Sequence, residues 1–213
     1  MKLVFLHGLG QTAKAWDRVI DSLGDHDCLA LELFDNGRLS ESYEVMDAHV
    51  RQELACMDDD VVVVGLSLGA SLAFRLLDNP PANVKGIIAC AGQYNLRGNP
   101  FYYLQKAMFK LLPKSTFAKQ GVDKVSLNKF YNSLAELDLT EVLTYTNLPC
   151  AIICGAKDKP NLKTSQKAAD LIPNATYHTI PNAGHLLTDE APEALAEVVQ
   201  AFLKKIKSEK LEN

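Results

Sequence analysis

The sequence predicts an α/β protein with a doubly wound, mostly parallel sheet of about six strands and a small helical insertion. Three observations lead to this fold class. Short apolar runs alternate with amphipathic segments along most of the 213 residues. These runs are continuous in valine, isoleucine and leucine, which is typical of parallel strands that are covered on both faces. One long segment, residues 93–148, contains no strand-like run.

Each apolar run except the fourth is followed by a segment with helical periodicity, so helices are expected on both sides of the sheet. The expected strands cover residues 2–6, 27–33, 61–64, 84–90, 149–154 and 176–180. The expected helices cover residues 16–23, 45–54, 68–77, 162–171 and 195–206. Ser42 is a candidate N-cap for the second helix, because a serine hydroxyl can accept a hydrogen bond from the first turn.

The segment 93–148 divides the sequence into a core, residues 1–92 and 149–213, and an insertion that is expected to be mostly helical. The insertion holds nine of the sixteen aromatic residues. Its composition fits a lid over an apolar pocket and a helical hairpin packed on the core equally well. If the segment is a lid, candidate substrate-binding side chains are those of Tyr94, Phe101, Tyr102 and Met108.

The charge balance gives no reason to expect nucleic acid or an anionic membrane as a partner. The sequence has 22 basic and 26 acidic residues, a formal charge of -4. No window approaches the ~20 apolar residues of a membrane span, and the first residues lack the pattern of a secretory signal. We expect a cytoplasmic protein that acts on a small molecule, as a monomer or a homodimer.

The cysteines favour reduced thiols over disulfides. There are five, an odd number, and Cys28, Cys90 and Cys154 fall at the ends of expected buried strands. No pattern of histidine and cysteine completes a metal site. We expect neither a metal nor another cofactor.

The strongest functional motif is Gly-Leu-Ser-Leu-Gly, residues 65–69, directly after four valines. A strand that turns sharply into a helix holds the turn residue in a strained conformation, with its side chain exposed above the sheet. The residues two before and two after then nearly touch, which favours Gly65 and Gly69. Ser67 is therefore a candidate nucleophile at a helix N-terminus, and the N–H of Leu68 is a candidate donor to an oxyanion.

A serine hydroxyl needs a base, and the base needs an orienting carboxylate. The chain resembles the α/β-hydrolase fold family, which carries nucleophile, acid and histidine in that order, each after a strand. The matching residues are Ser67 in "GLSLG", Asp158 in "GAKD" and His185 in "PNAGH". The resemblance implies that these three form a catalytic triad. It covers nearly the whole chain, although the insertion has no recognisable signature.

A further match lies after the first strand, in "LHGLG". In the family, the residue after this His-Gly pair supplies the second oxyanion donor, which is the backbone N–H of Leu9 here. His7 is expected to brace the loop. The family often has two more strands before this point, so the resemblance implies a trimmed core.

The resemblance implies a serine hydrolase, and a carboxylesterase acting on a small or medium ester is the first choice. Dehalogenases and epoxide hydrolases of this fold place an aspartate at the position of Ser67, which disfavours them. C–C bond hydrolysis, thioester cleavage, peracid formation and lyase chemistry use the same triad and stay open. A non-catalytic ligand-binding protein on the same fold is the alternative from another class.

Overall fold

The computed structural model describes residues 1–34, 39–97, 99, 102 and 124–212. Six strands form one sheet in the order β2-β1-β3-β4-β5-β6, and every neighbouring pair is parallel. The strands are β1 (Lys2–Leu6), β2 (Cys28–Leu31), β3 (Val61–Leu66), β4 (Val84–Cys90), β5 (Cys150–Gly155) and β6 (Thr176–Ile180). The predicted fold class is confirmed, and β3, which precedes the serine motif, lies inside the sheet between β1 and β4.

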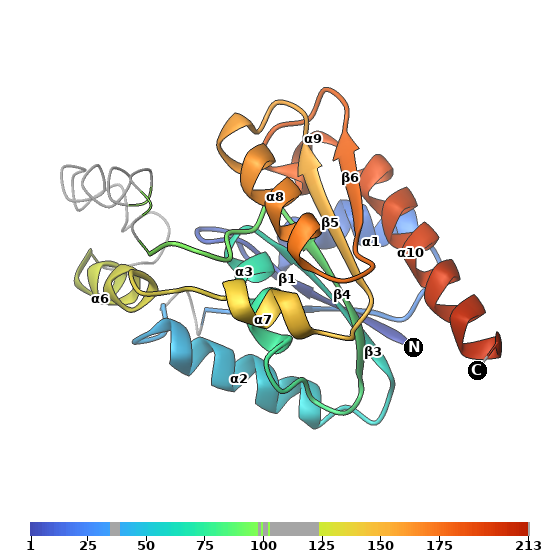
Figure 1. Ribbon diagram of the computed structural model, residues 1–213, viewed down its shortest axis with the longest axis horizontal. Helices are drawn as coiled ribbons and strands as arrows, with labels where there is room; N and C mark the ends of the chain where they lie inside the picture. Colours follow the sequence, from blue (N-terminus) through green and yellow to red (C-terminus); the bar gives the residue numbers. More distant parts are fainter. Residues whose placement is uncertain (35–38, 98, 100–101, 103–123, 213) are drawn as a thin grey trace.

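Helices cover both faces of the sheet (Figure 1). The helices that the structure describes are η1 (Ala13–Trp16, a 3₁₀ turn), α1 (Asp17–Leu23), α2 (Tyr43–Ala55), α3 (Leu68–Leu76), α6 (Lys124–Leu134), α7 (Thr140–Tyr145), α8 (Lys159–Leu171), α9 (Leu187–Glu190) and α10 (Pro192–Glu212). One face is covered by α1 and α10, and the other by α2, α3, α7 and α8.

The helix boundaries follow local signals, some of which the sequence analysis used. Ser42 caps α2, because its Oγ accepts a hydrogen bond from the N–H of Val45 at 3.3 Å. The helix expected at 162–171 begins three residues earlier, at Lys159, with Pro160 in its first turn. Proline fits there because its missing N–H would have no partner inside the helix.

The core consists of two apolar layers, one on each face of the sheet. On β3, Val61 and Val63 belong to the layer under α2 and α3, while Val62 and Val64 belong to the layer under α1 and α10. All four valines are fully buried, each contributing about 1.5–3 kcal/mol relative to an exposed side chain. Burial on both faces explains why this strand is an uninterrupted apolar run.

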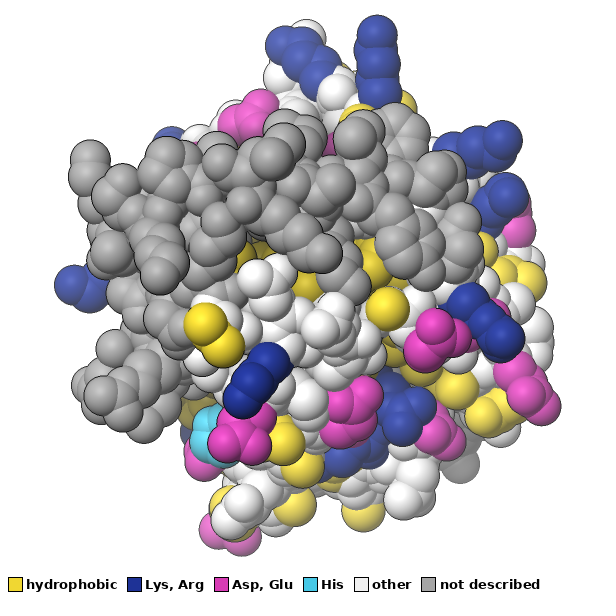
Figure 2. All heavy atoms as spheres, turned by 90° about the vertical axis from the view of Figure 1, so that its left-hand side faces the viewer, with side chains coloured by type: hydrophobic (Ala, Val, Ile, Leu, Met, Phe, Trp, Pro, Cys, Tyr) yellow, Lys and Arg dark blue, Asp and Glu magenta, His cyan; other side chains and the backbone are white. Residues whose placement is uncertain are grey.

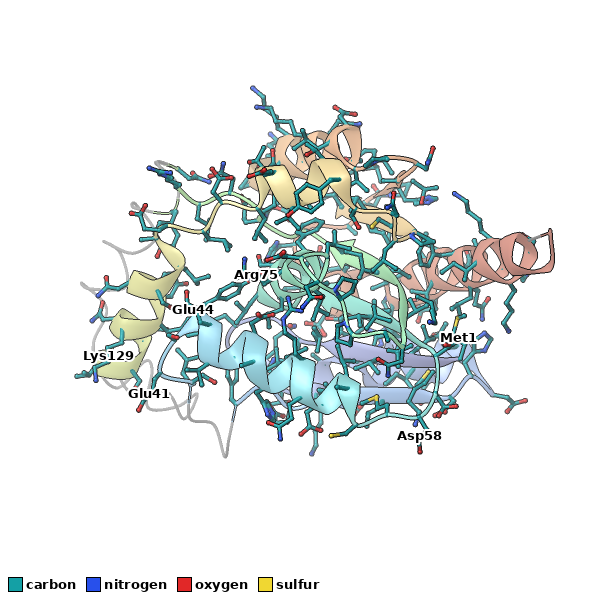
Figure 3. All side chains as sticks on the ribbon, turned by 60° about the horizontal axis from the view of Figure 1, so that its bottom comes forward. Met1, Glu41, Glu44, Asp58, Arg75 and Lys129 are labelled. Atoms are coloured by element: carbon teal, nitrogen blue, oxygen red, sulfur yellow. The ribbon has the colours of Figure 1, made fainter. Side chains whose placement is uncertain are left out.

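The helix α3, which starts beside the serine motif, is held against α2 by a charged cluster. Arg51 donates from Nε to Asp47 Oδ2 at 2.9 Å and from Nη2 to the carbonyl oxygen of Arg75 at 2.7 Å. The Arg75 Nε lies 3.8 Å from the same Asp47 oxygen, and Figure 3 shows Arg75 between α3 and α2. The cluster ties the two helices together at a partly buried site.

The described part of the segment between β4 and β5 contains α6, α7 and an antiparallel bridge between Asn95 and Asp138. The helical content agrees with the sequence expectation. Phe130 of α6 and Leu143 of α7 are fully buried in the same apolar layer as Val63. These helices therefore share a core with the sheet. The division into a core at 1–92 and 149–213 and a lid at 93–148 stays a prediction.

Charged side chains of both signs are mixed on the face shown in Figure 2. Acidic and basic side chains lie next to one another there, with apolar side chains between them. Among the helices that the structure describes, none combines the length and the apolar character that crossing a bilayer requires.

Candidate active site

Ser67 lies in a strained turn between β3 and α3. Its backbone dihedral φ is 56°, a conformation that side-chain-bearing residues rarely adopt. A Cβ atom on Gly65 would lie 2.2 Å from the carbonyl oxygen of Gly69, and one on Gly69 would lie 2.1 Å from that of Leu6. Both distances are far shorter than a van der Waals contact. The two glycines are therefore required by the close approach of three backbone segments.

The backbones after β5 and β6 also approach each other closely. A Cβ atom on Gly155, the last residue of β5, would lie 2.1 Å from the carbonyl oxygen of Gly184. The N–H of Lys157 donates to the carbonyl oxygen of Ala183 at 2.8 Å. This contact brings Asp158 on the first loop within reach of His185 on the second.

The structure brings Ser67, His185 and Asp158 together in hydrogen-bonding succession. Ser67 Oγ lies 3.1 Å from His185 Nε2, and His185 Nδ1 lies 2.7 Å from Asp158 Oδ2. The Asp158 side chain is 3% exposed, whereas that of His185 is 39% exposed. Because an ionised carboxylate only accepts hydrogen bonds, the proton of the neutral imidazole resides on Nδ1. Nε2 is then free to accept the Ser67 proton.

Two residues that the sequence did not point to form a short chain of hydrogen bonds that ends on Asp158. Asn161, in the first turn of α8, donates from Nδ2 to both carboxylate oxygens at 2.9 Å. Gln93, which follows β4, donates from Nε2 to Asn161 Oδ1. The carboxylate also stands at the N-terminal end of α8, where the helix dipole favours negative charge. An amide three residues after the acid is the only sequence signal for this cluster.

Leu9 and Leu68, whose backbone N–H groups are the expected oxyanion donors, lie at the same cavity as the serine. The loop of Leu9 is held by a hydrogen bond from the N–H of Gly8 to Gln11 Oε1 at 2.9 Å. Leu68 is the first residue of α3, so its N–H has no acceptor within that helix. The two N–H groups are therefore candidates to bind one oxygen atom together.

His7 braces the loop that carries Leu9. It is fully buried at the end of β1, and its Nδ1 lies 2.9 Å from the carbonyl oxygen of Gly8. Its Nε2 lies 2.8 Å from Glu32 Oε1 and 3.0 Å from the backbone nitrogen of Leu33. These contacts join the loops after β1 and β2, and none of them involves Ser67 or Asp158.

A cavity of about 280 Å³ opens beside Ser67 and His185. The residues lining it are Leu9, Ser67, Leu68, Ser71, Gln93, Leu96, Tyr102, Phe130, Tyr131, Leu134 and His185. Most of the wall is apolar. No lysine, arginine, aspartate or glutamate is among these described lining residues, and burial raises the pKa of the Tyr131 hydroxyl above its ordinary value.

The predicted substrate-binding residues fare differently. Tyr102 lines the cavity, whereas Tyr94 is not among the described lining residues. Tyr94 is 8% exposed, and its ring packs edge-on against that of Phe74, with 6.4 Å between the ring centres. Substrate contact by Tyr94 therefore stays a prediction, without support from the described lining of the cavity. Phe101 and Met108 lie outside the described residues. Phe130 and its neighbours on α6 were missed, because helical periodicity does not reveal which face meets the sheet edge.

All five cysteines are free thiols. Burial raises the pKa of Cys150 to about 12 and, as the largest of several influences, that of Cys154 to about 11. These thiols are protonated at neutral pH and act as apolar core groups. In the part of the chain that the structure describes, no three His, Cys, Asp or Glu side chains are grouped so as to hold a metal ion.

Residues 3–198 match the model of the alpha/beta hydrolase family, so the chain belongs to this family. The chain is 26% identical over 247 aligned positions to the "Uncharacterized hydrolase YugF" of Bacillus subtilis, covering 95% of this chain and 89% of that protein.

Solved structures share the fold at lower identity. MenH from S. aureus superposes with a TM-score of 0.80 at 17% identity, with 97% of this chain and 94% of that chain covered. A thermophilic esterase from Thermogutta terrifontis superposes with a TM-score of 0.77 at 18% identity, with 97% and 90% covered.

Proposed function

We propose that this chain is a serine hydrolase that cleaves a small or medium carboxylic ester through an acyl-enzyme. The observation that supports it most is the succession of hydrogen bonds from Ser67 through His185 to Asp158, beside an apolar cavity. Membership of the alpha/beta hydrolase family and the likeness to a named esterase support the same reaction class.

In the first half of the reaction, Ser67 Oγ attacks the carbonyl carbon of the ester while His185 Nε2 takes its proton. The N–H groups of Leu9 and Leu68 donate to the oxyanion of the tetrahedral intermediate, each stabilising it by about 3 kcal/mol. His185 then donates the proton to the leaving alkoxide. Asp158 accepts from Nδ1 throughout and stabilises the charged imidazolium.

In the second half, a water molecule replaces the departed alcohol. His185 Nε2 takes a proton from this water as its oxygen attacks the acyl carbon. The second tetrahedral intermediate uses the same two N–H groups. His185 returns its proton to Ser67 Oγ, and the carboxylic acid leaves.

The cavity favours an uncharged substrate of limited size. Its volume of about 280 Å³ is just below the ~300–1,000 Å³ typical of sites for drug-sized ligands. Two of the polar side chains in its wall already bind protein groups: Ser71 Oγ donates to the carbonyl oxygen of Gln93, and Tyr102 to that of Tyr131. We therefore infer that the substrate is selected mainly by apolar contact and volume.

The experiment combines a chromogenic short-chain ester with a fluorophosphonate probe, which reacts covalently only with an activated serine. We expect wild type to hydrolyse the ester and to be labelled at Ser67, and Ser67→Ala to lose both. Ser22→Ala is the matched control, because Ser22 is far from the cavity and its hydroxyl donates to the Arg18 carbonyl on α1. Equal hydrolysis by wild type and Ser67→Ala would exclude the proposal.

Thioesters, lactones and C–C substrates with the same acyl group belong in the same assay. A preference for one of them over the ester would keep the acyl-enzyme chemistry and change the substrate class. Labelling of Ser67 without turnover of any acyl substrate would favour a lyase on the same triad. Absence of labelling would favour a non-catalytic binding protein.

A further inference from the structure

A closed ring of hydrogen bonds passes through the candidate triad and three further residues. Side-chain bonds run from Ser67 through His185, Asp158 and Asn161 to Gln93, and Ser71 closes the ring by bonding to the backbone carbonyl oxygens of Gln93 and Ser67. We propose that Asn161 and Gln93 are positioning residues, which hold the Asp158 carboxylate in the orientation that His185 requires. This inference rests on the proposed function, because it assigns these residues to the same reaction.

The direction of each bond follows from the ionised carboxylate. Asp158 can only accept, so Asn161 must present its NH₂ group, which lies 2.9 Å from both carboxylate oxygens. This leaves Asn161 Oδ1 as an acceptor, so Gln93 must present its own NH₂ group to it. Both amide orientations are thus set by the charge on Asp158.

The other end of Gln93 supports this assignment independently. Its Oε1 is buried and has no hydrogen-bond partner among the groups that the structure describes. A buried carbonyl oxygen without a donor is unfavourable. Rotating the Gln93 amide by 180° would be worse, because it would place two acceptors, Gln93 Oε1 and Asn161 Oδ1, against each other. The hydrogen bond from Gln93 to Asn161 therefore fixes the amide even though it leaves Gln93 Oε1 without a donor.

Ser71 closes the ring on the opposite side. Its Oγ donates to the carbonyl oxygen of Gln93 at 2.6 Å, and its N–H donates to that of Ser67 at 3.0 Å. The backbone of Gln93 is thereby tied to the helix that begins at the elbow. The ring thus links the elbow of β3 and α3 to the loops after β4, β5 and β6.

Loss of Asn161 would leave the buried carboxylate with a single side-chain partner among the described residues, His185. The carboxylate could then rotate about its Cβ–Cγ bond, and the imidazole bonded to it would follow. Asn161 is not among the residues that line the cavity, so substrate binding should be unaffected. The expected signature is a lower kcat at an unchanged KM.

The test compares Asn161→Leu, Asn161→Ala, Gln93→Leu and the double variant Asn161→Leu/Gln93→Leu with wild type. Asn161→Ala removes the donor without adding a larger apolar group, so it serves if the leucine variant does not fold. Gln166→Leu is the matched control. It removes another amide-to-carboxylate bond on α8, from Gln166 Nε2 to Asp170 at 2.9 Å, on the exposed face.

The rate is expressed per serine labelled by the fluorophosphonate probe, so that misfolded protein does not count. Both Asn161 variants should lose up to about 100-fold in kcat. Gln93→Leu should lose less, and the double variant should be no slower than Asn161→Leu alone, because both changes break the same chain of bonds. Gln166→Leu should equal wild type.

A second readout does not depend on turnover. The Nδ1 proton of His185, bonded to Asp158, should give a low-field ¹H NMR signal that disappears in His185→Ala. We expect this signal to broaden or shift upfield in Asn161→Leu and to be unchanged in Gln166→Leu. If wild type hydrolyses no acyl substrate, the proposed function fails while this signal still decides the positioning role. An unchanged signal with unchanged kcat, or a double variant in which the two losses multiply, would overturn it.

Discussion

The cavity has a floor and a wall that are built in different ways. The floor is the carboxyl edge of the sheet, where backbone segments approach so closely that Gly65, Gly69 and Gly155 leave no space for a Cβ atom. The described wall is made of large side chains, among them Tyr102, and Phe130 from α6. Substitutions of the floor glycines should therefore disrupt the fold and the triad, whereas many substitutions in the wall should be tolerated. We expect backbone geometry to determine the reaction and side-chain volume to determine which substrates bind.

The largest effect is expected for Gly155→Ala. The new Cβ would lie 2.1 Å from the backbone oxygen of Gly184, so the two loops must separate. We expect a loss of about 3 kcal/mol or more in the free energy of unfolding, measured in urea. We also expect roughly 100-fold lower kcat in the folded fraction, because Asp158 and His185 move apart.

Gly184→Ala on the facing loop is the control for this change. The three atoms nearest to its Cβ would belong to the Glu190 carboxylate, the closest at 3.0 Å, and a side chain can shift at a smaller cost than backbone. It should be the more stable of the two variants. Equal stability would show that close backbone approach does not determine the floor.

The next effect concerns the wall. Phe130→Leu should cost about 1–2 kcal/mol of stability, because a fully buried ring becomes smaller. It should also shift the preferred ester toward longer acyl chains, measured as kcat/KM across a series. Phe74→Leu makes the same change in the core away from the cavity, so it should lose stability without this shift. If both variants keep the wild-type chain-length profile, Phe130 does not limit the substrate.

Alkylation should separate thiols of the core from those of the surface. Cys56 is exposed and should react with iodoacetamide in the native protein near pH 8. Cys150 and Cys154 should react only after unfolding, because burial gives them pKa values of about 12 and 11. Mass spectrometry of peptides identifies the modified residues. Native labelling of either buried thiol at the rate of Cys56 would show that the sheet opens readily.

The smallest effect is expected at His178, on the edge strand β6. Partial burial lowers its pKa below the ordinary histidine value. The unfolded chain therefore binds this proton at a higher pH than the folded chain, so the native state loses stability as the pH falls through that range. Between about pH 7.5 and about pH 5.5, the urea midpoint of wild type should fall slightly more than that of His178→Thr. An equal fall of the urea midpoint with pH in wild type and His178→Thr would contradict this assignment.

Much of the fold was predictable because its signals are local. An apolar run bounded by turns specifies a buried strand wherever it occurs, and the Ser42 hydroxyl caps the helix that follows it. The strained turn at Ser67 was also predictable, because the close approach that requires Gly65 and Gly69 is a property of adjacent residues. Asp158 and His185 were identified from their positions after strands and from a family resemblance.

The sequence by itself thus determined the strands, the elbow and three side chains that the structure brings together. Only the tertiary structure decided what lies around them: the amides of Asn161 and Gln93, the placement of Phe130 in the wall, and the packing of Tyr94 against Phe74. The reason is physical. Periodicity and turn chemistry act between neighbours, whereas Gln93 and Asn161 are 68 positions apart, and Ser67 and His185 are 118 apart. Contacts of that kind depend on how loops pack at the sheet edge, and no local pattern encodes them.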